Sequence, residues 1–184
     1  MFALMMCCGV NLLRQARLFP VVLALGAVTV AGQAMAAAQK VAVFDFELID
    51  SSLEGSMMGD DAAQDARLKR MAPMLREDIG ALPGYEIVDI QPVEKQAGDA
   101  NLQSCGNCAL RFAGQIGADV AVVGTVQKVS NLILNINAYA FDIKSGKTIA
   151  RGSADIRSNT DESWDRGLQY LFKTRLKAQL EKAR

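Results

Sequence analysis

ADVAVVGTVQKVS, residues 118–130, is the most strand-like segment of this 184-residue chain. Its closely spaced valines predict a strand with a buried position in a sheet. KVAVFDFEL, residues 40–48, is a second apolar run, short enough to be a strand that is covered on both faces. The rest of the domain is interpreted around these two strands.

The segment between the two strands predicts helices and one further strand. Residues 62–82 indicate a helix, because apolar residues recur at steps of three and four along one face: Leu68, Met71, Leu75, Ile79 and Leu82. Pro73 is expected to kink this helix or to mark a tighter second half. After it the pattern predicts a strand over 85–90, a polar connection over 91–103 and a short helix over 109–116.

The chain after residue 130 predicts an antiparallel meander and a closing helix. Residues 131–143 alternate, with Leu132, Leu134, Ile136, Ala138 and Ala140 on one side and Ile133, Asn135, Asn137, Tyr139 and Phe141 on the other. A hairpin leads to a strand over 147–157, and residues 159–162 start a helix that carries Trp164 into the core. The order β-α-β-α-β-β-β-α predicts an α/β fold, a single domain with a mixed sheet and helices packed on it.

The N-terminal segment predicts an export signal. Arg14 and Arg17 precede the apolar run 18–30, and the small residues of segment 32–38 suit signal peptidase, with a cut near Ala36 or Ala38. A membrane anchor is the alternative, but the apolar run is shorter than the roughly 20 residues that cross a bilayer. We therefore expect residues 1–38 to be a cleaved signal peptide and 39–184 a single periplasmic domain with no membrane span.

Composition excludes several classes of protein. The chain carries 20 basic and 20 acidic residues, and loss of Arg14 and Arg17 leaves 18 against 20, a net charge of −2. This balance gives no electrostatic affinity for nucleic acid. The chain has no histidine, which excludes Ser-His-Asp and Cys-His nucleophiles and metal sites that need imidazole. No cofactor is expected.

Cys105 and Cys108 are the two cysteines that remain after signal cleavage. In an oxidising compartment such close neighbours are expected to form a structural disulfide. A redox-active dithiol is the alternative, because the pair opens a short helix whose dipole favours a thiolate. The polar segment before the pair does not resemble the apolar strand that precedes a thioredoxin motif. Metal binding or an intermolecular disulfide is a third possibility.

The loop after the first strand contains a partial calcium-loop pattern. Asp50, Ser52, Glu54 and Asp61 fall at positions 1, 3, 5 and 12 of that pattern. Glu54 is long for its position, and Asp61 replaces the bidentate glutamate. A solvated loop with accidental spacing is the simpler interpretation, and the expectation is no metal site.

Polar residues on the strands suggest a ligand or partner face. It would consist of Asp45, Lys128, Ser130, Asn131, Asn135, Asn137 and Tyr139. A small ligand could lie between the loop that follows Asp45 and residues 128–137. The alternative is an ordinary solvent-facing side of an antiparallel sheet. Trp164 is interpreted as a core anchor.

Several segments resemble a known family. They are Val41–Phe46, the cysteine pair after Ser104, residues 117–119, residues 123–137, and the C-terminal segment 159–164 with Arg166, Gly167 and Tyr170. Together they resemble an uncharacterised family of short proteobacterial secreted proteins, a domain of unknown function. The likeness runs from about Lys40 to Leu176. The opening strand and the strand at 118–126 also resemble, more loosely, the TolB amino-terminal domain and related envelope domains such as CsgG.

This resemblance implies a mixed-sheet domain and a protein partner in the periplasm or envelope. It supplies no catalytic residues. It also implies a role as an accessory to an envelope or periplasmic oxidation system. The sequence therefore predicts a non-enzymatic binding or assembly module, with a thiol-disulfide protein that uses Cys105 and Cys108 as the alternative. The oligomeric state stays open.

Overall fold

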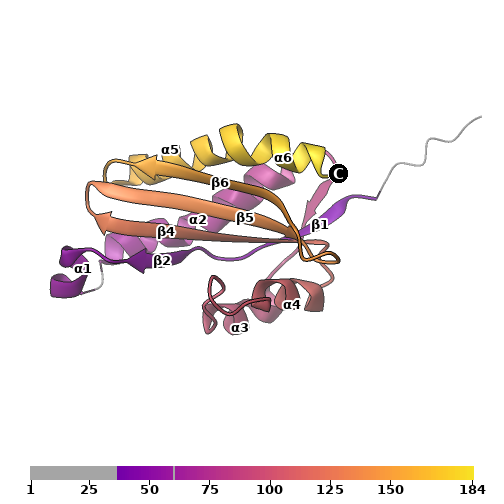
Figure 1. The fold of residues 1–184 in the computed structure, drawn as a ribbon, viewed down its shortest axis with the longest axis horizontal. Helices are drawn as coiled ribbons and strands as arrows, with labels where there is room; N and C mark the ends of the chain where they lie inside the picture. Colours follow the sequence, from indigo (N-terminus) through magenta and orange to yellow (C-terminus); the bar gives the residue numbers. More distant parts are fainter. Residues whose placement is uncertain (1–36, 60) are drawn as a thin grey trace, which may run out of the picture. The chain divides into compact units, whose positions relative to one another are not determined.

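β4 (Val120–Ser130), the segment expected to be most strand-like, lies at the centre of a mixed sheet of order β3-β1-β4-β5-β6. The computed structural model describes residues 37–59 and 61–184, so the predicted signal peptide lies outside the described residues except for its last two. β1 (Gln39–Val43), β2 (Glu47–Asp50) and β3 (Tyr85–Ile87) run parallel to their neighbours, whereas β5 (Ile133–Asp142) and β6 (Thr148–Ile156) form an antiparallel meander with β4 (Figure 1). The predicted single α/β domain with a mixed sheet is confirmed.

The first predicted strand is divided into two. β1 pairs with β4 through Val43↔Val122, and β2 resumes the pairing at Glu47↔Thr125. The segment from β1 to β2 therefore contains one more residue than the facing segment of β4. The extra residue turns the side chain of Phe46 over Gly124, where any Cβ would overlap the phenyl ring. The expectation of one continuous strand over 40–48 is therefore wrong at residues 44–46, because the apolar run hides a change of register.

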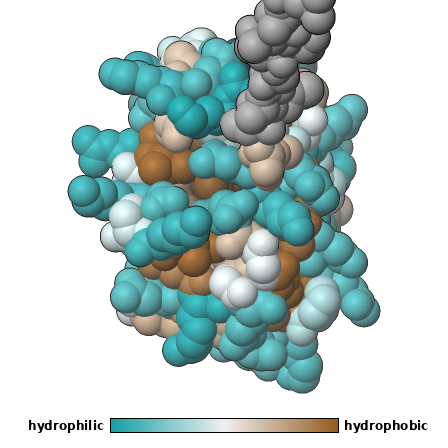
Figure 2. All heavy atoms as spheres, turned by 90° about the vertical axis from the view of Figure 1, so that its right-hand side faces the viewer, coloured by the Kyte–Doolittle hydropathy of each residue, from teal (hydrophilic) through white to brown (hydrophobic). Residues whose placement is uncertain are grey.

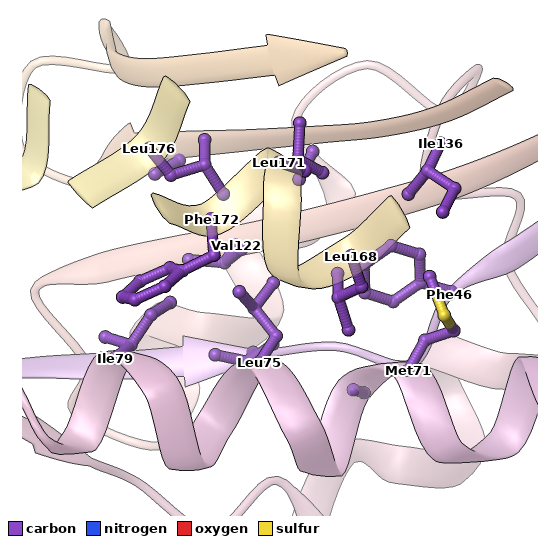
Figure 3. Packing of buried hydrophobic residues seen from close by; sticks show 14 of the residues in the cluster. Phe46, Met71, Leu75, Ile79, Val122, Ile136, Leu168, Leu171, Phe172 and Leu176 are labelled. Atoms are coloured by element: carbon purple, nitrogen blue, oxygen red, sulfur yellow. The ribbon is translucent and has the colours of Figure 1, made fainter. Parts of the chain in front are cut away.

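Two long helical segments cover one face of the sheet, which we call the helical face. α2 (Ala62–Gly80) contains Pro73 without interruption, and α5 (Asp161–Leu171) continues through a π-helical turn, η2 (Phe172–Leu176), into α6 (Lys177–Lys182). Figure 3 shows Met71, Leu75 and Ile79 of α2 directed towards Leu168, Leu171, Phe172 and Leu176 of the C-terminal helix. Trp164 is fully buried here, which confirms the prediction of a core anchor.

The opposite face of the sheet is covered only in part. η1 (Gln91–Val93), α3 (Glu94–Gly98) and α4 (Cys108–Gln115) pack under β1 and the start of β4 around Phe44, Phe112 and Val123. The distal halves of β4 and β5 have no helix beneath them in the part of the chain that the structure describes (Figure 1). We call this the open face.

The predicted alternation along β5 is confirmed with one exception. Leu134, Ile136, Ala138 and Ala140 are buried against the helices. Leu132 was expected among them but is 68% exposed, because it lies in the β4–β5 turn and the strand starts one residue later. The expected loop over 49–61 contains a short helix, α1 (Leu53–Met58). No helix of the described residues is both long and apolar enough to cross a membrane.

Candidate functional site

Exposed hydrophobic side chains gather at one end of the domain. Seven of the eight large hydrophobic residues that are exposed in the described chain belong to three neighbouring segments: Ile49, Leu53, Met57, Met58, Val129, Leu132 and Ile133. We call this set the apolar end. Met57 and Met58 are the most exposed, at 76% and 83%. A hydrophobic set of this kind is unusual on the surface of a domain that stays alone in water.

The sheet brings these segments together. β2 pairs with the last third of β4, with Asp50 opposite Lys128, and α1 follows β2 directly. The β4–β5 turn therefore lies beside α1, and both are at the left end of the molecule in Figure 1. Met58 and Asn131 line the same open hollow, of about 340 Å³. Residues that are 73 positions apart in the sequence thus contribute to one surface.

Polar contacts hold the base of the apolar end. The Lys128 ammonium group donates to Asp50 at 3.0 Å, and the side chain of Lys128 is only 4% exposed. Ser51 donates through its backbone and its hydroxyl to the carbonyl of Lys128. Burial works to raise the pKa of Asp50, but hydrogen bonds from Ser52 and from Lys128 outweigh it and lower that pKa to about 2. Asp50 is therefore charged and paired.

A second polar cluster fixes the β4–β5 turn against the helices. Asn159 accepts from the Trp164 indole at 2.9 Å and donates to Gln64 and to Asn131 at 3.0 and 3.1 Å. Its backbone also donates to the carbonyl of Asn131. Thr160, within the predicted helix start at residues 159–162, is the N-cap of the last helix. The turn that carries Leu132 is thus anchored to the core through Trp164.

The predicted polar face is not one face. Side chains alternate along paired strands, so Lys128 and its partner Leu134 point to the helical face while Asn135, Asn137 and Tyr139 point to the open face. Asn135 donates there to Ser153 and Asp155. Asp45 lies elsewhere and accepts from Arg76 at 3.0 Å. Of the predicted set, Lys128, Ser130 and Asn131 lie at the apolar end.

Three of the four predicted residues of the partial calcium loop have other roles in the structure. Asp50 pairs with Lys128, the Ser52 hydroxyl caps α1, and Asp61 caps α2. No group of three potential metal ligands occurs within residues 37–59 and 61–184. The exposed apolar residues within this loop were missed by the sequence interpretation. The signal that could have found them is Leu53, Met57 and Met58 in an otherwise polar segment.

Cys105 and Cys108 are joined by a disulfide, with their Cα atoms 5.7 Å apart. The bond closes the turn that precedes α4, whose first residue is Cys108. Gly106 inside this turn has φ of 72°, a left-handed conformation that suits glycine. Arg111 lies one turn along the helix, with its guanidinium 3.7 Å from the Cys108 sulfur.

Comparison with known proteins identifies a family. The model of DUF3280, described as "Protein of unknown function (DUF2380)", matches residues 39–176. A comparison with curated proteins finds no match.

Similar solved structures include three bacterial proteins. They are the LpoB C-terminal domain of Salmonella enterica (15% identity, 68% of this chain and 87% of that one, TM-score 0.48), lipoprotein GNA1162 of Neisseria meningitidis (20%, 65% and 80%, 0.43) and TolB of Acinetobacter baumannii (9%, 68% and 25%, 0.37). The chain thus spans about a quarter of the TolB chain.

Proposed function

The chain belongs to the DUF3280 family of proteins of unknown function, and on that premise we propose that it is a non-enzymatic periplasmic module that binds a protein partner through its apolar end. The observation that carries this proposal is the set of seven exposed hydrophobic side chains in one place. Exposed hydrophobic side chains that are grouped at one end of a domain are a feature of interaction sites.

The composition of the apolar end suits a protein partner. Met57 and Met58 have flexible, polarizable side chains that adapt to irregular apolar surfaces. α1 has no buried residue, so its position depends on few packing contacts and a partner can reorient it at little cost. Asp50 is paired with Lys128 and Asp61 caps α2, so hydrophobic contact is the main attraction that these two charges leave at this end.

Two further observations support the location and the absence of catalysis. The predicted signal peptide exports the chain, and a disulfide between Cys105 and Cys108 suits an oxidising compartment. A chain without histidine lacks the commonest general base of enzymes. Within the envelope, the first partner to test is a periplasmic oxidation system, to which the protein would be an accessory.

In-cell photocrosslinking tests the proposed surface. A photoreactive residue replaces Met57 or Leu132 in the full chain, and Lys177, an exposed position on α6, serves as the control. The expected result is one adduct of defined mass from both positions and none from the control. Leu53→Asp should abolish the adduct while the thermal unfolding profile stays unchanged, because Leu53 is 72% exposed.

The outcomes separate the alternatives. Absence of an adduct from Met57 and Leu132 would contradict a docking surface at the apolar end. An adduct of twice the chain's mass would assign the surface to a second copy of the chain in place of a different protein. Mass spectrometry of the adduct then identifies the partner and tests the proposed accessory function. If the partner has no oxidoreductase role, the accessory function is rejected and the binding function remains.

A thiol-disulfide protein is the second candidate function, favoured by the position of Arg111. A guanidinium group 3.7 Å from the Cys108 sulfur, at the first residue of a helix, would stabilise a thiolate. The Cys108 residue is only 9% exposed, which opposes reaction with a protein substrate. Reduction of insulin by dithiothreitol with the purified protein as catalyst, and with Cys105→Ser as the control, tests this function. No turnover above the control would reject it.

A further inference from the structure

A cavity separate from the apolar end lies between the disulfide turn and the open face of the sheet. Its volume is about 220 Å³. The loop residues Gln103 and Asn107 and the α4 residue Leu110 form one wall, and Val123, Tyr139 and Phe141 form the floor. Hydrophobic residues are visible among hydrophilic ones in the lower part of Figure 2, at the level of α4.

The floor of the cavity is aromatic. Tyr139 and Phe141 stand two positions apart on β5, so both point to the open face, and their rings stack with centroids 6.4 Å apart and an interplanar angle of 21°. Val123 and Ala121 are their partners on β4, and these small side chains leave the rings uncovered from that strand. Two near-parallel rings present a surface on which a third ring can stack.

The rim of the cavity carries hydrogen-bonding groups that are free. Asn107 occupies the N-cap position of α4, yet its side chain makes no capping bond. Within the described residues, no side-chain hydrogen bond reaches the Gln103 amide or the Tyr139 hydroxyl either. None of the residues that line the cavity is acidic or basic. The site therefore offers amide and phenol groups to an uncharged ligand.

We propose that this cavity binds a free small molecule with one aromatic ring and an uncharged hydrogen-bonding substituent, such as a phenol. The volume decides the size class. A cavity of about 150 Å³ holds benzene, whereas drug-sized ligands need roughly 300 Å³ or more. A volume of about 220 Å³ accommodates one substituted ring between these limits.

The disulfide supports the wall of this site. Gly106 and Asn107 line the cavity and lie inside the turn that the Cys105–Cys108 bond closes. Loss of the bond frees the turn to adopt other conformations, which moves the Asn107 amide away from the floor. The site thus gives the cysteine pair a role in ligand binding that requires no redox turnover.

Nuclear magnetic resonance titration of the purified, disulfide-bonded protein with phenol tests the proposal. We expect saturable shift changes at the amides of Leu110, Val123 and Gly146, with Kd of about 1 mM or tighter for so small a ligand. Cyclohexanol, which has similar size but no aromatic ring, should bind about tenfold more weakly because it lacks the stacking contribution. Toluene, which lacks the hydroxyl, should also bind more weakly than phenol.

Variants separate a specific site from general adsorption. Tyr139→Ala should weaken phenol binding about tenfold, while Tyr170→Ala, at an exposed tyrosine of α5, should leave it unchanged. Leu110→Trp is a second test in case Tyr139→Ala does not fold, because the larger side chain should fill the cavity and prevent phenol binding. The double change Cys105→Ser and Cys108→Ser should weaken binding several-fold. The proposal is overturned if phenol causes no saturable shift changes, or if the shift changes are the same in Leu110→Trp. It is also overturned if N-acetyltyrosinamide binds more tightly than phenol, because that result would identify a partner's side chain as the occupant.

Discussion

The Asp50–Lys128 pair is the residue contact on which the base of the apolar end depends. Lys128 is the one charged residue that is buried among those described, at 3% exposure, and Asp50 neutralises it. Asp50→Asn leaves a buried ammonium group without a counter-charge, so we expect a loss of about 3 kcal/mol in the free energy of unfolding. Urea denaturation measures it.

Two further variants test whether the buried charge is the cause. Lys128→Met in the Asp50→Asn background removes the unpaired charge and should recover most of the loss. Asp99→Asn, which breaks the exposed Lys95–Asp99 pair, should change nothing measurable. A loss in the double variant equal to that of Asp50→Asn alone would show that the charge is not responsible.

The lowered pKa of Asp50 also predicts a pH dependence. Its pKa is about 2 in the folded protein and 3.8 in the unfolded chain, so its contribution is fully present above pH 3.8 and is lost as the pH falls through about 2. Because Asp142 and Asp161 also have lowered pKa values, the measurement compares wild type with Asp50→Asn from pH 5 to 2. The stability gap should narrow on acidification; a constant gap contradicts the assignment.

Gly124 is required by its close approach to Phe46. Any Cβ at this position overlaps the buried phenyl ring, so we expect Gly124→Ala to destabilise the fold by about 2 kcal/mol. Gly98→Ala is the matched control, because no atom lies within 4 Å of its Cβ position at the end of α3. That change should be neutral or stabilising by about 0.5 kcal/mol, since alanine favours a helix. Equal effects of both changes on urea denaturation would refute the packing argument.

Among the elements, the outer edge of β6 is protected by a side chain. Gln179 of α6 accepts from the Arg151 backbone N–H at 3.2 Å and donates to its carbonyl at 2.8 Å, as a neighbouring strand would. Gln179→Ala should cost about 1 kcal/mol and expose the edge to pairing with other molecules. Sedimentation velocity should then detect self-association at high concentration. The Lys177→Ala variant, changed on the same helix, should self-associate no more than wild type. Identical sedimentation of the two variants would contradict the role of Gln179 in protecting the edge of β6.

Hydrophobic periodicity predicted most of the elements, because a helix or strand that buries one face carries apolar residues at regular intervals. The alternation along β5 and the inward residues of the last helix, from Trp164 to Leu180, are examples. The gap between β1 and β2 could not be predicted in this way. Phe44 and Phe46 are both buried, against opposite faces of the sheet, so the sequence stays apolar across the gap. A run that is apolar on both sides of a register change looks like one strand. The π-helical turn over 172–176 is hidden in the same way, since Phe172 and Leu176 keep the helical spacing of four.

At the scale of the whole molecule, the candidate site could be predicted only in part. Lys128 and Asn131 were identified from the chain, but the polar face was divided by the sheet, which places Lys128 and Asn135 on opposite sides. The apolar end depends on the pairing of β2 with β4, a contact between residues 78 positions apart. Single exposed hydrophobic residues are ordinary, and Met57 and Leu132 gain meaning only when that pairing places them at the same end.

The disulfide is expected to form only after export, so the exported protein should differ from the same domain produced in the cytoplasm. β1 begins at Gln39, whose backbone donates to the carbonyl of Gly84, so a cut after Ala38 leaves every described strand intact. The exported protein should have the mass of residues 37–184 or 39–184 and no thiol that reacts with a maleimide. Residues 39–184 produced in the cytoplasm should carry two reactive thiols. Closing the four-residue loop contributes about 2 kcal/mol, so the reduced form should melt roughly 4–8 °C lower while still folding around the same core. A periplasmic product that retains residues 1–38 or free thiols would contradict this account, as would equal melting temperatures of the two forms.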